Sequence, residues 1–73
     1  MTVIRVLPPP GECRRVREEA HITRSEVAEL VGVHEVSLAR WEKGERVPRR
    51  RHRERWLAVL DQLRQAVAEA TVA

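Results

Sequence analysis

The sequence predicts an all-α domain of four or five helices, preceded by an extended segment and closed by a long helix. Apolar residues recur at helical spacing through most of the chain, and glycines and prolines divide it into stretches of helix length. The chain has 73 residues, which is enough for one modest hydrophobic core. We therefore expect a single domain over residues 1–73.

Residues 2–9 are expected to form an extended N-terminal arm, because "TVIRVL" is rich in branched apolar side chains and three prolines follow it. A first helix is predicted from about Pro10 to Ala20, since proline is favoured at the first helical position. Its inward-facing apolar residues are Cys13, Val16 and Ala20. Arg17 lies about 40° round the helix from Cys13 and so also faces inward.

Two short helices are predicted within residues 23–44. The first begins with the capping box "TRSE", and Gly32 suits the left-handed turn that ends it. Its expected buried residues are Val27, Leu30 and Val31. The second helix runs from about His34 to Lys43 and is ended by Gly44. Its core anchors are Leu38 and Trp41.

A long helix is predicted over residues 49–70, after Pro48. Its apolar stripe consists of Trp56, Val59, Leu60, Leu63 and Val67. A helix of about 20 residues is near 30 Å long, which is longer than a three-helix core needs. Leu63 and Val67, towards its far end, are therefore candidate dimer-interface residues.

The charge distribution favours an anionic partner. The net charge is +3 and the pI about 10.4, which points first to nucleic acid and second to an anionic membrane surface. Residues 46–55 contain six arginines against one acid. This run is interpreted as a phosphate clamp, with Arg46 and Arg49 as the contacts. A solvated surface and a targeting signal are the alternatives.

Other classes of function find little support in the sequence. The single cysteine and three scattered histidines give no disulfide framework and no metal-ligand spacing. No phosphate-cradling glycine loop and no nucleophile with a spaced base is present, so we expect neither an enzyme nor a cofactor. The chain has no bilayer-spanning stretch and no signal-peptide pattern at its start, so a cytoplasmic location in bacteria, or in a phage host, is expected.

Helical geometry predicts an ion pair inside the domain. Glu42 lies four residues after Leu38, about 40° round the same helix, and therefore faces the protein. Because an unpaired buried carboxylate is costly, a basic partner is required, and Arg17 is the inward-facing cation of the first helix. We predict an Arg17–Glu42 pair. The alternative is that Glu42 reaches solvent at the helix end.

The opposite face of the 34–43 helix has the character of a DNA-reading surface. Val36, Arg40 and Lys43 share this face, and a valine beside two cations suits a thymine methyl next to phosphate or guanine. An ordinary exposed valine is the alternative. Residues at the start of such a helix reach base edges, which adds His34, Glu35 and Ser37 to the candidates.

Glu35 has two compatible interpretations. Its carboxylate could accept a hydrogen bond from cytosine N4, lowering general affinity while raising discrimination. It could also be a favourable charge at the positive end of the helix.

The stretch "VREEAHITRSEVAELVGVHEVSLARWEKGERVP" resembles the helix-turn-helix of the lambda repressor/Cro type, also called the XRE family, over residues 13–48. The matching positions are Arg17, Thr23-Arg24, Val27-Ala28, Gly32-Val33, Leu38, Arg40-Trp41-Glu42, Gly44 and Pro48. The resemblance implies a repressor-like fold, an inner arginine–glutamate ion pair, and DNA binding by the second of the two short helices, usually as a dimer on an inverted repeat. It further implies phosphate contact at Arg24, and contacts to bases or adjacent phosphates at Glu35, Val36 and Arg40.

Two positions and one region depart from the family pattern. His21 occupies a place where glycine is usual, which implies a strained or differently shaped turn. His34 replaces the common serine or threonine cap. After Pro48 one long helix is predicted where the family usually has a short pair, so the family's dimer interface does not carry over.

These observations predict a sequence-specific regulator that binds double-stranded DNA, such as a small phage-type repressor or Cro-like protein acting as a homodimer by operator occupancy. The candidate phosphate contacts are Arg24, Lys43, Arg46 and Arg49. The alternatives are an antitoxin-like module that binds a protein partner and regulates its own gene, and a nonspecific architectural DNA binder.

Overall fold

The computed structural model describes residues 6–71, and within that range the chain forms four α-helices and no strand. They are α1 (Pro10–Glu19), α2 (Arg24–Val31), α3 (Glu35–Lys43) and α4 (Arg50–Thr71). The predicted all-α class with a long C-terminal helix is confirmed. Residues 2–5 of the predicted arm lie outside the described residues; among its described residues, Val6 is exposed and Leu7 packs against the core.

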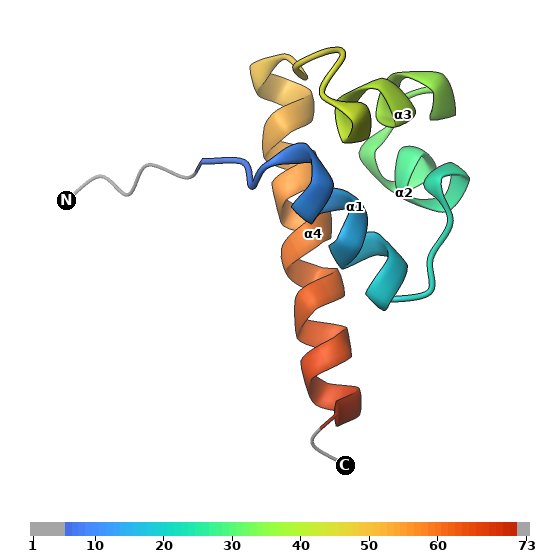
Figure 1. Cartoon of the computed structure of the whole chain (residues 1–73), viewed down its shortest axis with the longest axis vertical. Helices are drawn as coiled ribbons and strands as arrows, with labels where there is room; N and C mark the ends of the chain where they lie inside the picture. Colours follow the sequence, from blue (N-terminus) through green and yellow to red (C-terminus); the bar gives the residue numbers. More distant parts are fainter. Residues whose placement is uncertain (1–5, 72–73) are drawn as a thin grey trace, which may run out of the picture.

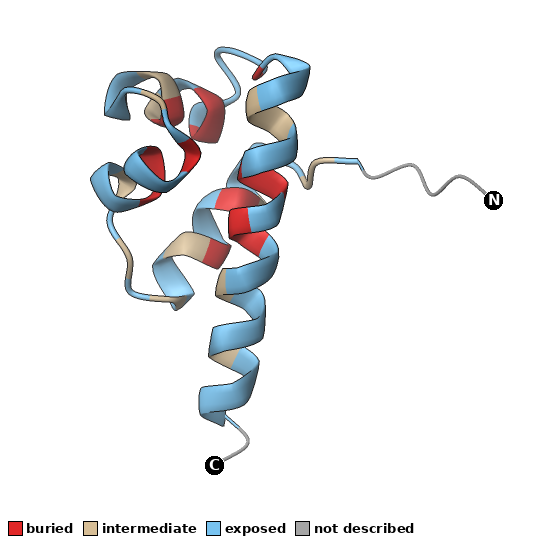
Figure 2. Cartoon of the chain, turned by 180° about the vertical axis from the view of Figure 1, so that it is seen from behind, coloured by how far each residue is buried: buried red, intermediate tan, exposed pale blue. Residues whose placement is uncertain are grey.

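The long helix α4 extends along the length of the domain (Figure 1). Its N-terminal half packs against α1 and α2, and α3 packs against the same two helices. Seen from behind, the buried residues gather where these helices face one another, whereas the C-terminal turns of α4 extend beyond them and are largely exposed (Figure 2). The core therefore lies around one half of α4.

Local signals set the ends of α2 and α3 as predicted. Thr23 Oγ1 accepts a hydrogen bond from the Glu26 backbone N–H at 3.1 Å, and the Thr23 N–H donates to Glu26 Oε1 at 3.3 Å, which completes the capping box. Gly32 and Gly44 end the two helices with φ values of +88° and +76°. Most other residues would strain the backbone there by about 1–2 kcal/mol.

The buried face of α2 differs from the prediction in one residue. Leu30, expected in the core, is 53% exposed, whereas Ala28 is buried together with Val27 and Val31. On a helical wheel the centre of the buried face lies between Ala28 and Val31, which leaves Leu30 at the edge. The sequence pattern places Leu30 near Val27 but cannot say on which side of Val27 the neighbouring helices lie.

Cys13 is a core residue, as its place on α1 predicts. Its side chain is almost fully buried, and Sγ lies 3.5 Å from the Pro8 carbonyl oxygen. Burial disfavours the thiolate and raises the pKa of Cys13 to about 11. The thiol is therefore protonated at neutral pH and serves packing rather than chemistry.

The turn between α1 and α2 has an unusual backbone. His21 adopts a left-handed conformation with φ +56°, in a position where the resemblance leads one to expect glycine. The His21 N–H donates to the Glu18 carbonyl at 3.0 Å, and the Ile22 N–H donates to Arg17 at 3.3 Å. These bonds hold the turn in the conformation that glycine would adopt more easily.

Candidate nucleic-acid interface

The helix α3 has one face in the core and one face in solvent. Leu38 and Trp41 are buried against the other helices. On the outer face Glu35 and Arg40 are exposed, and the Val36 side chain keeps half of its surface accessible. The helix is thus anchored from behind and presents its outer residues to a partner.

His34 caps the start of α3. Its backbone is extended, with φ −74° and ψ 145°, and its Nδ1 accepts a hydrogen bond from the Val36 N–H at 3.1 Å. The imidazole nitrogen thereby does what a serine or threonine oxygen does at an ordinary N-cap. The sequence comparison identified His34 as a departure from the usual cap but did not identify this hydrogen bond.

The chain folds back on α3 at its other end. After Gly44, the N–H groups of Glu45 and Arg46 both donate to the Arg40 carbonyl oxygen, at 3.0 and 3.4 Å. The Trp41 ring lies between α3 and α4, with ring centroids 5.3 Å from Trp56 and 6.0 Å from His52. These contacts hold the segment that follows α3 beside the end of that helix.

Candidates for reading bases and candidates for binding phosphate lie close together near the C-terminal end of α3. Ser37 and Arg40 of α3, together with Arg46 and Arg49 from the following loop, line one surface depression of about 250 Å³. The three arginines are exposed, and Ser37 is half-buried. Lys43, the last residue of α3, is exposed as well. The outer face of α3 is therefore continuous with a basic surface at its C-terminal end.

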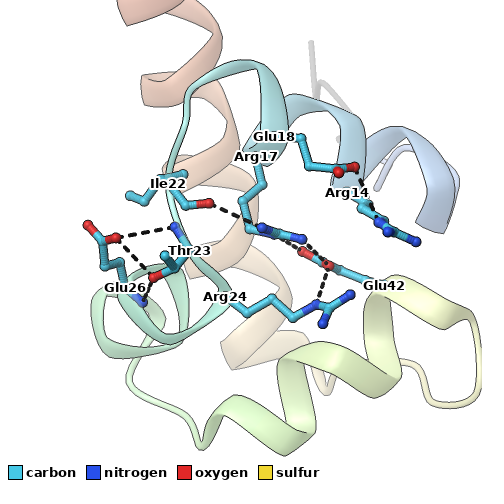
Figure 3. Close-up of polar contacts among 8 residues, drawn as sticks. All are labelled: Arg14, Arg17, Glu18, Ile22, Thr23, Arg24, Glu26 and Glu42. Atoms are coloured by element: carbon cyan, nitrogen blue, oxygen red, sulfur yellow. Dashed lines mark hydrogen bonds and ion pairs between the residues drawn. The ribbon is translucent and has the colours of Figure 1, made fainter.

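A buried charge network attaches α3 to the two preceding helices (Figure 3). Glu42 is buried, and its Oε2 and Oε1 accept hydrogen bonds from Arg17 Nε at 2.6 Å and Nη2 at 3.0 Å. Arg17 Nη1 also donates to the Ile22 carbonyl at 3.1 Å. The structure thus contains the ion pair expected from the helical wheel. The hydrogen bond with Glu42 raises the pKa of Arg17, and a guanidinium is in any case charged in proteins.

Arg24 is a second partner of Glu42 that sequence reasoning missed. Its Nε donates to Glu42 Oε1 at 3.0 Å, and the side chain remains about a third exposed at 32%. The terminal nitrogens of Arg24 lie beyond this contact (Figure 3). Glu42 therefore fixes the stem of Arg24 at the start of α2 and leaves the end of the side chain towards the surface.

The arrangement of α2, the tight turn at Gly32 and α3 is that of two helices joined by a short link. The sequence profile of the helix-turn-helix family matches residues 14–61, which is more than half of the chain. The chain belongs to the XRE-type helix-turn-helix family. The resemblance drawn from the sequence is thus confirmed, and the protein is a DNA-binding transcription regulator of this type. No curated protein and no solved structure gave a significant match.

The two residues expected at a dimer interface lie away from the helix-turn-helix. Leu63 and Val67 of α4 are half-buried and line a groove of about 380 Å³ with Ala20 and His21 at the end of α1. This groove shares no residue with the basic depression beside α3. The basic depression beside α3 and this partly apolar groove are therefore separate surfaces of the helix-turn-helix protein.

The described part of this helix-turn-helix protein holds no cluster of three or more potential metal ligands. None of its described helices combines the length and apolar character needed to cross a bilayer.

Proposed function

We propose that this protein is a sequence-specific regulator of the small phage-type repressor or Cro-like class, which acts by occupying an operator in double-stranded DNA. The observation that supports this most strongly is the outer face of α3, where exposed Glu35, Val36 and Arg40 adjoin the basic surface at Arg46 and Arg49. A helix of this kind fits the major groove of B-DNA.

In this proposal the candidate residues divide into two groups. The base readers are His34, Glu35, Val36, Ser37 and Arg40. The phosphate contacts are Arg24, Lys43, Arg46 and Arg49. They come from the start of α2, the end of α3 and the loop before α4. Phosphate contacts at several points around α3 would set its orientation in the groove, while base contacts would supply selectivity.

Three of the base readers match different features of the groove. Glu35 accepts a hydrogen bond and suits the cytosine N4 amino group, whereas Val36 suits a thymine methyl group. Arg40 donates and suits guanine or a nearby phosphate. The carboxylate of Glu35 repels phosphate, so it lowers affinity for all DNA while favouring sites with cytosine in reach.

We further propose that two copies bind an inverted repeat through the groove at Leu63 and Val67. In such a dimer the two reading helices would lie about 34 Å apart, one turn of DNA. The same groove also supports the alternative function, an antitoxin-like module that binds another protein there and retains DNA binding for autoregulation. The oligomeric state distinguishes these two possibilities. Light scattering of the protein alone, and with a two-half-site duplex, measures whether two copies associate with each other.

Replacing Arg46 and Arg49 together with glutamine is expected to weaken binding to all duplexes. The plot of log affinity against log salt should become shallower by about 2, because two phosphate contacts and their released counterions are lost. Fluorescence anisotropy of a labelled duplex at several salt concentrations measures both quantities.

The matched control replaces Arg14 and Arg15, exposed residues of α1 that pair with Glu18 and Glu19. This control removes the same charge from the protein. Its slope of log affinity against log salt should stay near that of the wild type. Equal slopes for both double variants would contradict a phosphate clamp at the end of α3.

A further inference from the structure

The cap of α3 determines which nitrogen of His34 carries a proton. Nδ1 accepts the Val36 N–H at 3.1 Å, and a ring nitrogen accepts only through a free lone pair. A neutral imidazole has one N–H, so the proton must be on Nε2. A serine or threonine cap does not fix the position of a proton in this way, because its hydroxyl group rotates freely.

The second nitrogen of the same ring faces away from the helix. The two nitrogens of an imidazole are directed apart, so a ring that turns Nδ1 to the first turn of α3 turns Nε2–H away from it. His34 is exposed, and within residues 6–71 no hydrogen bond of Nε2 is found. An oriented N–H donor is therefore available at the start of α3, next to Glu35.

We propose that His34 is a specificity-determining residue, which donates its Nε2–H to an acceptor atom of a base in the major groove. The inference rests on the proposed function, in which the start of α3 reaches base edges. The acceptors exposed there are purine N7, guanine O6 and thymine O4. Glu35 can only accept, so the two neighbouring side chains read opposite features of the groove.

The variant His34→Ser separates the two roles of the side chain. Serine is a good N-cap and satisfies the Val36 amide, but its hydroxyl is too short to reach where Nε2 lies. Its melting temperature should therefore equal or exceed that of the wild type. The variant His34→Ala removes cap and donor together, and its melting temperature should fall by roughly 4–8 °C.

The first test is made on the free protein. A two-bond ¹⁵N–¹H correlation spectrum at pH 8 should show His34 as the Nε2–H tautomer. A predominant Nδ1–H tautomer would overturn the proposal whatever the DNA experiments gave.

The second test is selection from a pool of random duplexes with the wild type and His34→Ser. The wild type should prefer a base with a major-groove acceptor at one position, and His34→Ser should lose about tenfold in discrimination there. An identical motif from both proteins overturns the role of His34 and leaves the proposed function standing. A uniform loss of affinity over all sequences would mean that the Nε2–H of His34 donates to phosphate. That result would also overturn the role of His34 in specificity. If the wild type selects no motif, the proposed function fails and this inference fails with it.

Discussion

Replacing Glu42 with glutamine is expected to lower the free energy of unfolding by about 3 kcal/mol, because removing one partner of a buried ion pair leaves the other charge uncompensated. Here a single carboxylate, 1% exposed, serves both Arg17 and Arg24. Glutamine keeps the shape and one acceptor but not the charge. Urea denaturation followed by circular dichroism measures the change.

Glu45→Gln is the matched control, since Glu45 lies just after α3 and is exposed. Its effect should remain within about 0.5 kcal/mol. Equal stabilities for the two variants would show that the carboxylate of Glu42 is solvated and that α1, α2 and α3 are held together without it. The Glu42 variant should also lose DNA affinity, because Arg24 is no longer held at the start of α2.

Replacing Leu38 with alanine is expected to destabilise the domain by roughly 2–5 kcal/mol, the usual result of deleting a buried leucine side chain. Leu38 is fully buried and belongs to the helix proposed to contact DNA. A domain of this size has a total stability of about 4–11 kcal/mol, so the loss is a large part of the whole. Thermal and urea denaturation should both show it.

Leu30→Ala provides the comparison for Leu38. The same atoms are deleted from α2, but Leu30 is half exposed, and the expected loss is within about 1 kcal/mol. Similar losses at the two positions would mean that Leu30 is buried, as the sequence pattern alone suggested, and that the described packing of α2 is incorrect.

Several parts of the fold follow from local sequence because their causes are local. The capping box at Thr23 and the left-handed turns at Gly32 and Gly44 depend on residues within one helical turn. The ion pair of Arg17 and Glu42 could be anticipated because helical geometry turns both side chains to the same interior, where each charge needs a partner.

Other features depend on how the helices pack, which local sequence does not determine. Arg24 contacts Glu42 because the start of α2 lies beside the end of α3, and the exposure of Leu30 depends on where α1, α3 and α4 lie around α2. The cap by His34 requires a particular ring orientation. The surface that pairs two copies depends on a partner chain, so Leu63 and Val67 remain candidates.

Selection of bound sequences from a random duplex pool, with wild type and Glu35→Ala in parallel, tests most directly whether α3 reads DNA. The wild type should yield a motif, and Glu35→Ala should lose the preference for cytosine at one position while binding random DNA more tightly. Glu29→Ala, an exposed acid of α2, is the control and should reproduce the wild-type motif. A wild-type pool without any motif would contradict sequence-specific recognition by α3.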